Sequence, residues 1–224
     1  MQLDLYIIDA FAERAFTGNP AAVCPLEGWL DTNTMQAIAH EINLSETVFI
    51  VPTGEEYEIR WFTPIKEVDM IGHATLAAGH LILNHLNWRH GSVVFLHPSG
   101  NMTVRQNNDT LTIDMPPLMP TSIPCKNTLV TALNHKPNEV LSNKHYLCVF
   151  DNEDVVRNIK PDFSKIANLD LPAVIITAPG SKGFDFVCRF FAPANGVLED
   201  PVSGVALCCL TPFWGQRLEK QSMM

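Results

Sequence analysis

The chain has 224 residues, of which 46% are hydrophobic, and its formal net charge at pH 7 is -9. This excess of acidic side chains argues against nucleic acid or a membrane surface as a partner, because both attract basic patches. No apolar run is long enough to span a bilayer, and the length suffices for two modest domains.

The N-terminus and the cysteines favour a cytoplasmic protein. Asp4 stands where a signal peptide needs a basic residue. The six cysteines form no C-x-x-C pair and most lie in apolar stretches, which is typical of buried, reduced thiols. The eight histidines do not supply the closely spaced ligands of a zinc site, so we expect no metal. The sequence contains no G-x-G-x-x-G motif and no P-loop, so the usual sequence evidence for nucleotide binding is absent.

The first half of the sequence predicts a curved, mostly antiparallel sheet around one helix. Asp31 is expected to cap a first helix that ends near Asn43. A second helix, near residues 72–86, opens at Gly72 and is apolar on nearly every face, so we expect it to be buried. The predicted strands cover residues 3–8, 21–25, 45–51, 58–63, 93–96, 102–105 and 111–115.

Prolines then mark a boundary between two halves. Pro116, Pro117, Pro120 and Pro124 fall where neither a helix nor a central strand tolerates them. We therefore predict one domain over 1–117 and another over 118–224. The second is expected to contain strands over 145–150, 173–177 and 184–191 and a central helix near 204–219.

A repeated pattern relates the two halves. Residues 60–64 read Arg-Trp-Phe-Thr-Pro and residues 189–193 read Arg-Phe-Phe-Ala-Pro, and each is followed by an apolar helix, opening at Gly72 or Gly204. The pattern favours an internal duplication, although coincidence is the alternative because strand-then-helix is a common order. Two helix N-termini facing each other could hold an anionic substrate from both sides.

Three side chains are candidates for chemistry. Glu46 stands at the mouth of an apolar strand, where partial desolvation suits a carboxylate to proton transfer near neutral pH. The alternative is a solvated glutamate. Asp200 is a second acid–base candidate with the same alternative, and it could also simply cap the helix that follows it. His73 could donate a hydrogen bond to substrate or be structural.

Five short motifs, at residues 18–23, 44–47, 60–64, 72–75 and 199–204, extend over almost the whole chain. In this order they resemble the motifs of the PhzF family of phenazine-biosynthesis-like proteins. That resemblance implies an α+β fold of the diaminopimelate epimerase type, with two similar domains and the active site in the cleft between them.

The resemblance also implies an activity. The family includes an isomerase that moves a proton within a dihydro-hydroxyanthranilate without cofactor or metal, and Glu46 matches its acid–base residue. Transferred by motif, the substrate-binding residues are Asn19, Gly72, His73, Asp200, Ser203 and Gly204. We therefore expect a cofactor-independent isomerase or epimerase that acts on a small anionic, carboxylate-bearing metabolite as a cytoplasmic homodimer.

Two departures from the family pattern keep alternatives open. Ser203 replaces a threonine and Val205 replaces a second hydroxyl, and the chain stops soon after the second helix, which suggests a truncated, incomplete second domain. The alternative function is therefore a PhzF-fold binding or regulatory protein with impaired catalysis. A racemase that uses a cysteine pair is a third reading, but residues 70–73 offer no cysteine. The sequence does not identify the substrate.

Overall fold

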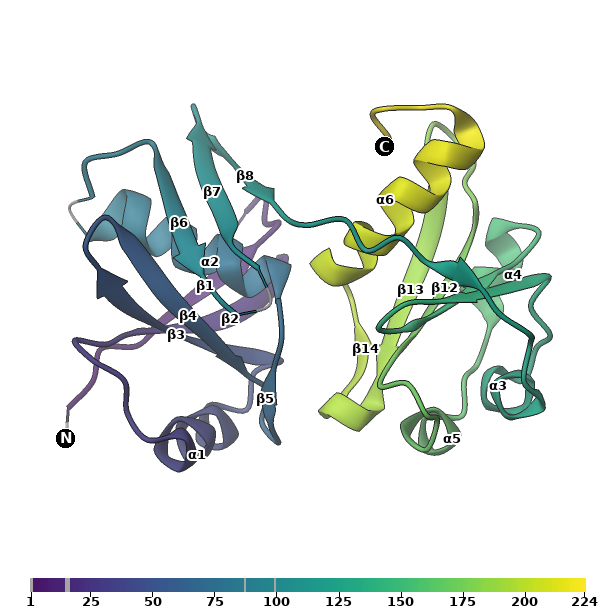
Figure 1. Ribbon diagram of the computed structural model, residues 1–224, viewed down its shortest axis with the longest axis horizontal. Coiled ribbons are helices and arrows are strands. Elements are labelled where there is room, and N and C mark those ends of the chain that lie inside the picture. The colour runs from purple at the N-terminus through teal and green to yellow at the C-terminus, as the bar shows by residue number, and fades with distance from the viewer. Residues whose placement is uncertain (1, 15–16, 87, 99) are drawn as a thin grey trace. The chain divides into compact units, whose positions relative to one another are not determined.

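A computed structural model describes residues 2–14, 17–86, 88–98 and 100–224 of the chain. The chain divides into two compact units, Met1–Pro116 and Pro117–Met224, each with its own sheet and helices (Figure 1). Within the described residues, no helix is both long enough and apolar enough to cross a membrane.

The first unit is built on one sheet of eight strands. Their order is β1-β2-β3-β4-β6-β7-β8, and the short β5 pairs with β4 beside β6. The pairs β2–β3 and β4–β6 are parallel and the other pairs are antiparallel. The strands are β1 (Tyr6–Ala10), β2 (Asn19–Pro25), β3 (Glu46–Thr53), β4 (Glu56–Phe62), β5 (Glu67–Val68), β6 (Ser92–Leu96), β7 (Met102–Asn107) and β8 (Thr110–Asp114).

The sheet curls around the helix α2 (Gly72–His85), which contacts strands from both ends of the strand order. Small residues on α2, among them Ala74, Ala77 and Ala78, let the helix lie close to the strands, and all three are buried. Its partners are the strand residues that face inward, such as Val48 and Ile50 of β3. This inner face forms the largest apolar core of the unit.

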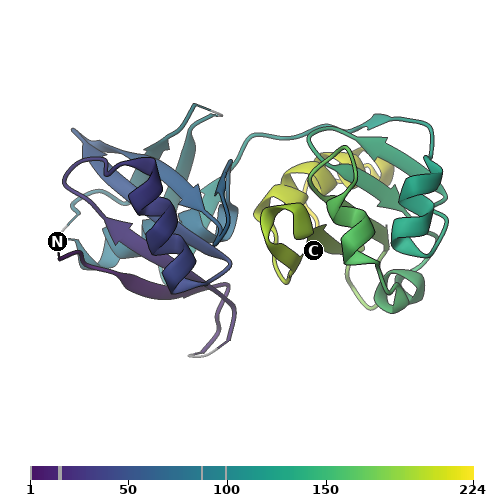
Figure 2. The ribbon, with the colours of Figure 1, turned by 90° about the horizontal axis from the view of Figure 1, so that it is seen from below.

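The helix α1 (Thr32–Ile42) covers the outer face of the same sheet, and it lies in front of the strands when the molecule is seen from below (Figure 2). The side chain of Asp31 caps it by accepting a hydrogen bond from the backbone N–H of Thr34. Asn43 ends it in the left-handed conformation, with φ of 54°. Both predicted ends of this helix are confirmed: the Asp31 side chain caps its start, and the backbone N–H of left-handed Asn43 donates to the carbonyl of Ala39 at its end.

The second unit has one six-stranded sheet with helices on both faces. The long helix α6 (Gly204–Leu218) packs on one face, and the short helices α3 (Asn127–Leu133), α4 (Glu153–Asn158) and α5 (Phe163–Ala167) cover the other. A 3-10 turn, η1 (Pro193–Asn195), follows β13 (Phe186–Ala192). In spatial order the strands are β14 (Val197–Asp200), β13 (Phe186–Ala192), β12 (Val174–Pro179), β11 (Tyr146–Val149), β10 (Glu139–Ser142) and β9 (Thr121–Ser122).

The predicted fold class is confirmed: each unit has a mostly antiparallel sheet packed against a long apolar helix. The two central helices begin at Gly72 and Gly204, as predicted. The three short helices of the second unit were not predicted from the sequence. Each has seven residues or fewer, which is too short for a helical hydrophobic period to stand out.

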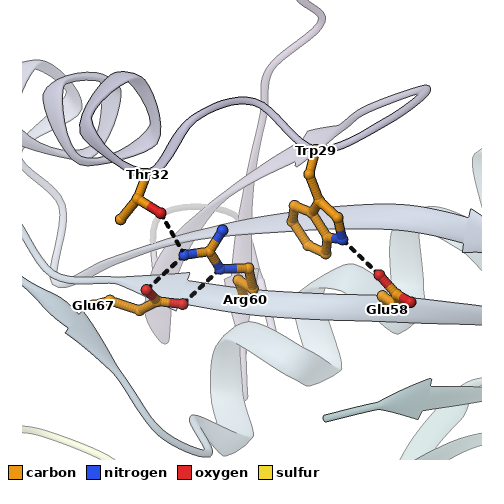
Figure 3. Close-up of polar contacts among 5 residues, drawn as sticks. All are labelled: Trp29, Thr32, Glu58, Arg60 and Glu67. Carbon is orange, nitrogen blue, oxygen red and sulfur yellow. Dashed lines mark hydrogen bonds and ion pairs between the residues drawn. The ribbon is translucent and has the colours of Figure 1, made fainter. Parts of the chain in front are cut away.

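The repeated motif forms an ion pair ahead of α2. Arg60 on β4 holds Glu67 on β5 through two contacts, Nε to Oε1 at 2.6 Å and Nη2 to Oε2 at 2.7 Å (Figure 3). The guanidinium also lies 5.3 Å from the ring centre of Phe62. The pair joins β4 to the strand from which the chain turns into Gly72.

The second unit repeats this arrangement ahead of α6. Arg189 on β13 holds Glu199 on β14, with Nε to Oε1 at 2.7 Å and Nη2 to Oε2 at 2.9 Å. Its guanidinium lies 4.8 Å from the ring centre of Phe191. Glu199 precedes Gly204 by the same number of residues as Glu67 precedes Gly72. The two halves therefore share a local structure as well as a sequence pattern.

Candidate active site

Glu46 is the first residue of β3 and only 5% of it is exposed. Side chains alternate between the two faces of a strand, so Glu46 shares the inner face with Val48 and Ile50, which pack around α2. The start of β3 thus places a carboxylate at the edge of the apolar core. Such a group is costly to bury unless a partner or ligand compensates it.

His73 provides the nearest partner. It lies in the first turn of α2, is 1% exposed, and its Nε2 is 3.1 Å from Oε2 of Glu46. The two atoms are close but not aligned for a hydrogen bond, and neither has another hydrogen-bond partner among the described residues. The buried carboxylate and the buried imidazole therefore lie close together, and each has one atom that can still form a hydrogen bond with a ligand.

Asn19 lies at the same end of the sheet. It opens β2, which runs parallel to β3 with Ala21 opposite Glu46. Asn19 shares the inward-facing side of β2 with Ala21, by strand alternation, and is 2% exposed. The structure therefore brings Asn19, Glu46 and His73 to one end of one face in the first unit.

The N-terminus of α2 supplies backbone donors at this position. Ile71 precedes the helix in an extended conformation, and no side chain of the described residues caps it. The first N–H groups of a helix have no partner within the helix, so an uncapped end favours an anion. Just before it, Met70 adopts a left-handed φ of 51°, which is unusual for a residue other than glycine. The chain accepts this strain where it turns into Gly72.

The remaining predicted residues belong to the second unit. Asp200 ends β14, Ser203 precedes α6, and Gly204 is the first residue of that helix. Asp200 accepts a hydrogen bond from the N–H of Val202, at 3.3 Å. Ser203 is the cap, because its Oγ accepts from the N–H of Ala206, at 3.4 Å. The alternative that Asp200 caps α6 is therefore wrong.

A small pocket of about 110 Å³ opens at this end of α6, and Asp200 and Ser203 both line it. Phe190 and Ala206 form part of its wall. Val205, the departure from the family pattern, instead packs against the apolar cluster between α6 and the sheet. Ser203, which replaces the threonine of the family pattern, keeps a hydroxyl group in the lining of the pocket.

Two further polar residues were not singled out from the sequence. Ser45 and Thr47 flank Glu46, and their hydroxyl oxygens are buried without a hydrogen-bond partner among the described residues. Thr47 is on the opposite face of β3 from Glu46, by strand alternation. The available signal was their place beside Glu46 in the motif over residues 44–47.

Three buried cysteines do not resemble the activated thiols of a cysteine-dependent racemase. Burial raises the pKa of Cys24, Cys208 and Cys209 to about 11. A catalytic thiol needs its pKa lowered toward neutrality. Among the described residues, no group of three or more histidine, cysteine or acidic side chains could hold a metal ion.

The sequence model of the phenazine biosynthesis-like protein family matches residues 8–224. A protein named as an uncharacterized isomerase of Pseudomonas aeruginosa is 44% identical over 220 residues, which cover 98% of this chain and 85% of that protein. A crystal structure of a PhzF-family phenazine biosynthesis protein from Enterococcus faecalis is 42% identical. Its TM-score is 0.88, and the match covers 100% of this chain and 86% of that one.

A more distant neighbour indicates the wider fold group. A hydroxyproline epimerase from Agrobacterium vitis has a TM-score of 0.65 at 9% identity, covering 98% of this chain and 78% of that one. At this identity the likeness concerns the fold alone.

Proposed function

This chain belongs to the phenazine biosynthesis-like family, and from that premise we propose that it is a cofactor-independent isomerase that moves a proton between carbons of a small carboxylate-bearing metabolite. The names of its relatives support the isomerase class. The proposal goes further by assigning the proton transfer to Glu46 and the substrate class to anions.

The observation that carries this proposal is the buried pair of Glu46 and His73 beside the uncapped end of α2. A general base must reach its proton from a fixed position, and one that is so placed contributes about 10²–10⁴ in rate. Glu46 is held by β3, and the apolar core on its inner face excludes water. These features suit a carboxylate that exchanges a proton with a bound molecule.

In the proposed reaction, the carboxylate of Glu46 removes a proton from a carbon next to a carbonyl or carboxylate group. The C–H electron pair moves into the conjugated system and places negative charge on oxygen. Backbone N–H groups at the start of α2, around Gly72, stabilise that oxygen, and each such donor contributes roughly 3–4 kcal/mol. Glu46 then returns the proton to a different carbon, so atoms and charge balance without an external reductant or oxidant.

We assign His73 to orienting Glu46 and to donating a hydrogen bond to the bound anion. Its Nε2 lies 3.1 Å from the carboxylate, and the imidazole has donor capacity that the described residues leave unused. Asn19 serves as a further polar contact in the first unit. Asp200, Ser203 and Gly204 are proposed substrate-binding residues of the second unit, because they line or border the pocket at the start of α6.

Incubation with candidate acids in deuterated water tests this function. The panel includes the dihydro-hydroxyanthranilate of the related isomerase and simple amino and hydroxy acids. The wild-type protein is expected to place deuterium on carbon in at least one of them. Glu46→Gln, which keeps the shape but cannot carry the proton, should still bind that acid and lose the exchange.

A second candidate is a binding or regulatory protein with the same fold. Val205 motivates it, because an apolar side chain occupies the place of a family hydroxyl that could contact an anion. Loss of one such contact costs about 1–3 kcal/mol. Binding of an acid without any carbon exchange, in both wild type and Val205→Ser, would favour this candidate over the isomerase.

A further inference from the structure

The outer face of the first sheet contains a pocket that the proposed reaction does not use. Its volume is about 410 Å³, within the range of small-molecule sites. Glu58 and Arg60 line it from β4 and alternate with Ile59 and Trp61, whose side chains face α2. The pocket is therefore on the opposite face of the sheet from Glu46 and His73.

A fork in the sheet creates this pocket. β4 pairs with β6 only at Tyr57 and Glu58, and with β5 only at Trp61 and Phe62. Between these points, the described strands leave the chain at positions 59 and 60 without a partner on that side. This gap between β5 and β6 leaves room beside β4 for the pocket.

The charges in the pocket leave one carboxylate uncompensated. Arg60 is neutralised by its two contacts with Glu67, and its Nη2 also donates to Oγ1 of Thr32, at 3.0 Å. Glu58 accepts a hydrogen bond from the indole N–H of Trp29, at 2.5 Å, and forms no ion pair with a described residue (Figure 3). A half-buried carboxylate bound only to a neutral donor favours a cation.

Trp29 provides the wall beside this carboxylate. Its indole N–H points at Glu58, and the guanidinium of Arg60 lies 5.4 Å from its ring centre (Figure 3). Leu96 and Pro98 add apolar surface to the same pocket. An aromatic wall next to an acid is the combination that recognises an organic ammonium group attached to a flat or apolar body.

We propose that this pocket, lined by Trp29, Glu58 and Arg60, is a second ligand site that binds a small primary amine with an aromatic or apolar body. The ammonium group contacts the carboxylate of Glu58, and the body lies against Trp29 and Pro98. The site is independent of the isomerase proposal, because it shares no residue with Glu46 and its neighbours.

Benzylamine is the probe for this site, and the indole N–H signal of Trp29 in a proton–nitrogen correlation spectrum is the readout. Trp29→Phe assigns the signal, and the indoles of Trp61, Trp88 and Trp214 serve as internal references. Benzylamine should shift the Trp29 signal in a saturable way. Benzyl alcohol has the same shape without the charge, and it should bind about tenfold more weakly.

Glu58→Gln is the matched variant, because the amide oxygen can still accept the indole hydrogen bond. It should weaken benzylamine binding about tenfold and abolish the preference over benzyl alcohol. Asp114→Asn, which removes an exposed carboxylate on β8, should change nothing. The proposal is overturned if benzylamine gives no saturable shift, if benzyl alcohol or benzoate binds as well, or if Glu58→Gln binds benzylamine like the wild type.

Discussion

Arg60 and Arg189 make equivalent contacts in two different sheets. Each guanidinium grips a glutamate on the neighbouring strand through two hydrogen bonds and lies against an aromatic ring two residues further along its own strand. The hydrogen bonds to the Glu67 carboxylate raise the pKa of the Arg60 guanidinium. Each pair fixes the strand that leads into a central helix, which gives the sequence repeat a physical role.

We predict that Arg60→Lys lowers the free energy of unfolding by about 1 kcal/mol, because an ammonium group cannot make the two-pronged contact or stack on a ring. Urea denaturation of the purified protein measures this. Arg105→Lys is the control, since Arg105 pairs with Asp114 where both side chains are at least half exposed. An equal loss in both variants would mean that the paired geometry adds nothing.

Gly79 lies where α2 approaches β7 closely. A Cβ at this position would lie 2.6 Å from Cγ1 of Val104 on β7. Alanine gains up to about 1 kcal/mol over glycine in helix propensity, whereas overpacking a core costs about 1–3 kcal/mol. We therefore expect Gly79→Ala to lower the denaturation midpoint.

The double variant Gly79→Ala/Val104→Ala isolates the cause of that loss. Removing the valine methyls should make the double variant more stable than the sum of the two single changes predicts. Gly91→Ala, where nothing lies within 4 Å of the added carbon, should be close to neutral. Strict additivity of the Gly79 and Val104 changes would contradict a direct clash.

His145 makes the stability of the second unit depend on pH. Its Nδ1 is buried without a hydrogen-bond partner among the described residues, and its ring packs edge-on against Phe190. Burial, helped by the charge of Lys144, lowers its pKa from 6.5 to about 4. Between these values the unfolded chain binds the proton and the folded chain does not. Stability from the neutral ring is therefore complete above pH 6.5 and is lost as the pH falls toward 4.

Over this pH range the free energy of unfolding falls by up to roughly 3 kcal/mol, since one pKa unit corresponds to about 1.4 kcal/mol. Thermal melts between pH 4 and 7 measure it. His145→Gln should flatten the pH dependence in this window relative to the wild type. His135→Gln is matched, because exposed His135 makes a similar edge contact with Phe150. An unchanged slope in His145→Gln would exclude this histidine as the source.

Short sequence patterns predicted the features of this fold that depend only on residues close together in the chain. Asp31 begins α1 through its side chain, and Asn43 ends it through a left-handed backbone whose N–H donates to the carbonyl of Ala39. The apolar run after Gly72 could only be a buried helix. The approach of His73 to Glu46 depends instead on how β3 and α2 pack. No spacing along the chain encodes that distance, and the motif resemblance pointed to the residues without their geometry.

The pocket at Glu58 could not be predicted for a related reason. It exists because β5 and β6 pair with different parts of β4, and strand pairing between distant segments leaves no local pattern. The short helices of the second unit were missed because their order comes from packing on the sheet, around Ile166 and Val156. Short helices gain most of their stability from such contacts.

The rate at which deuterium is incorporated at carbon is the most direct test of the claim that Glu46 transfers the proton. With any acid that the wild type labels in deuterated water, mass spectrometry gives the labelling rate for wild type, Glu46→Gln and the exposed control Glu41→Gln. We predict that Glu46→Gln is slower by about 10²–10⁴ while Glu41→Gln matches the wild type. Labelling by Glu46→Gln at the wild-type rate would contradict the account.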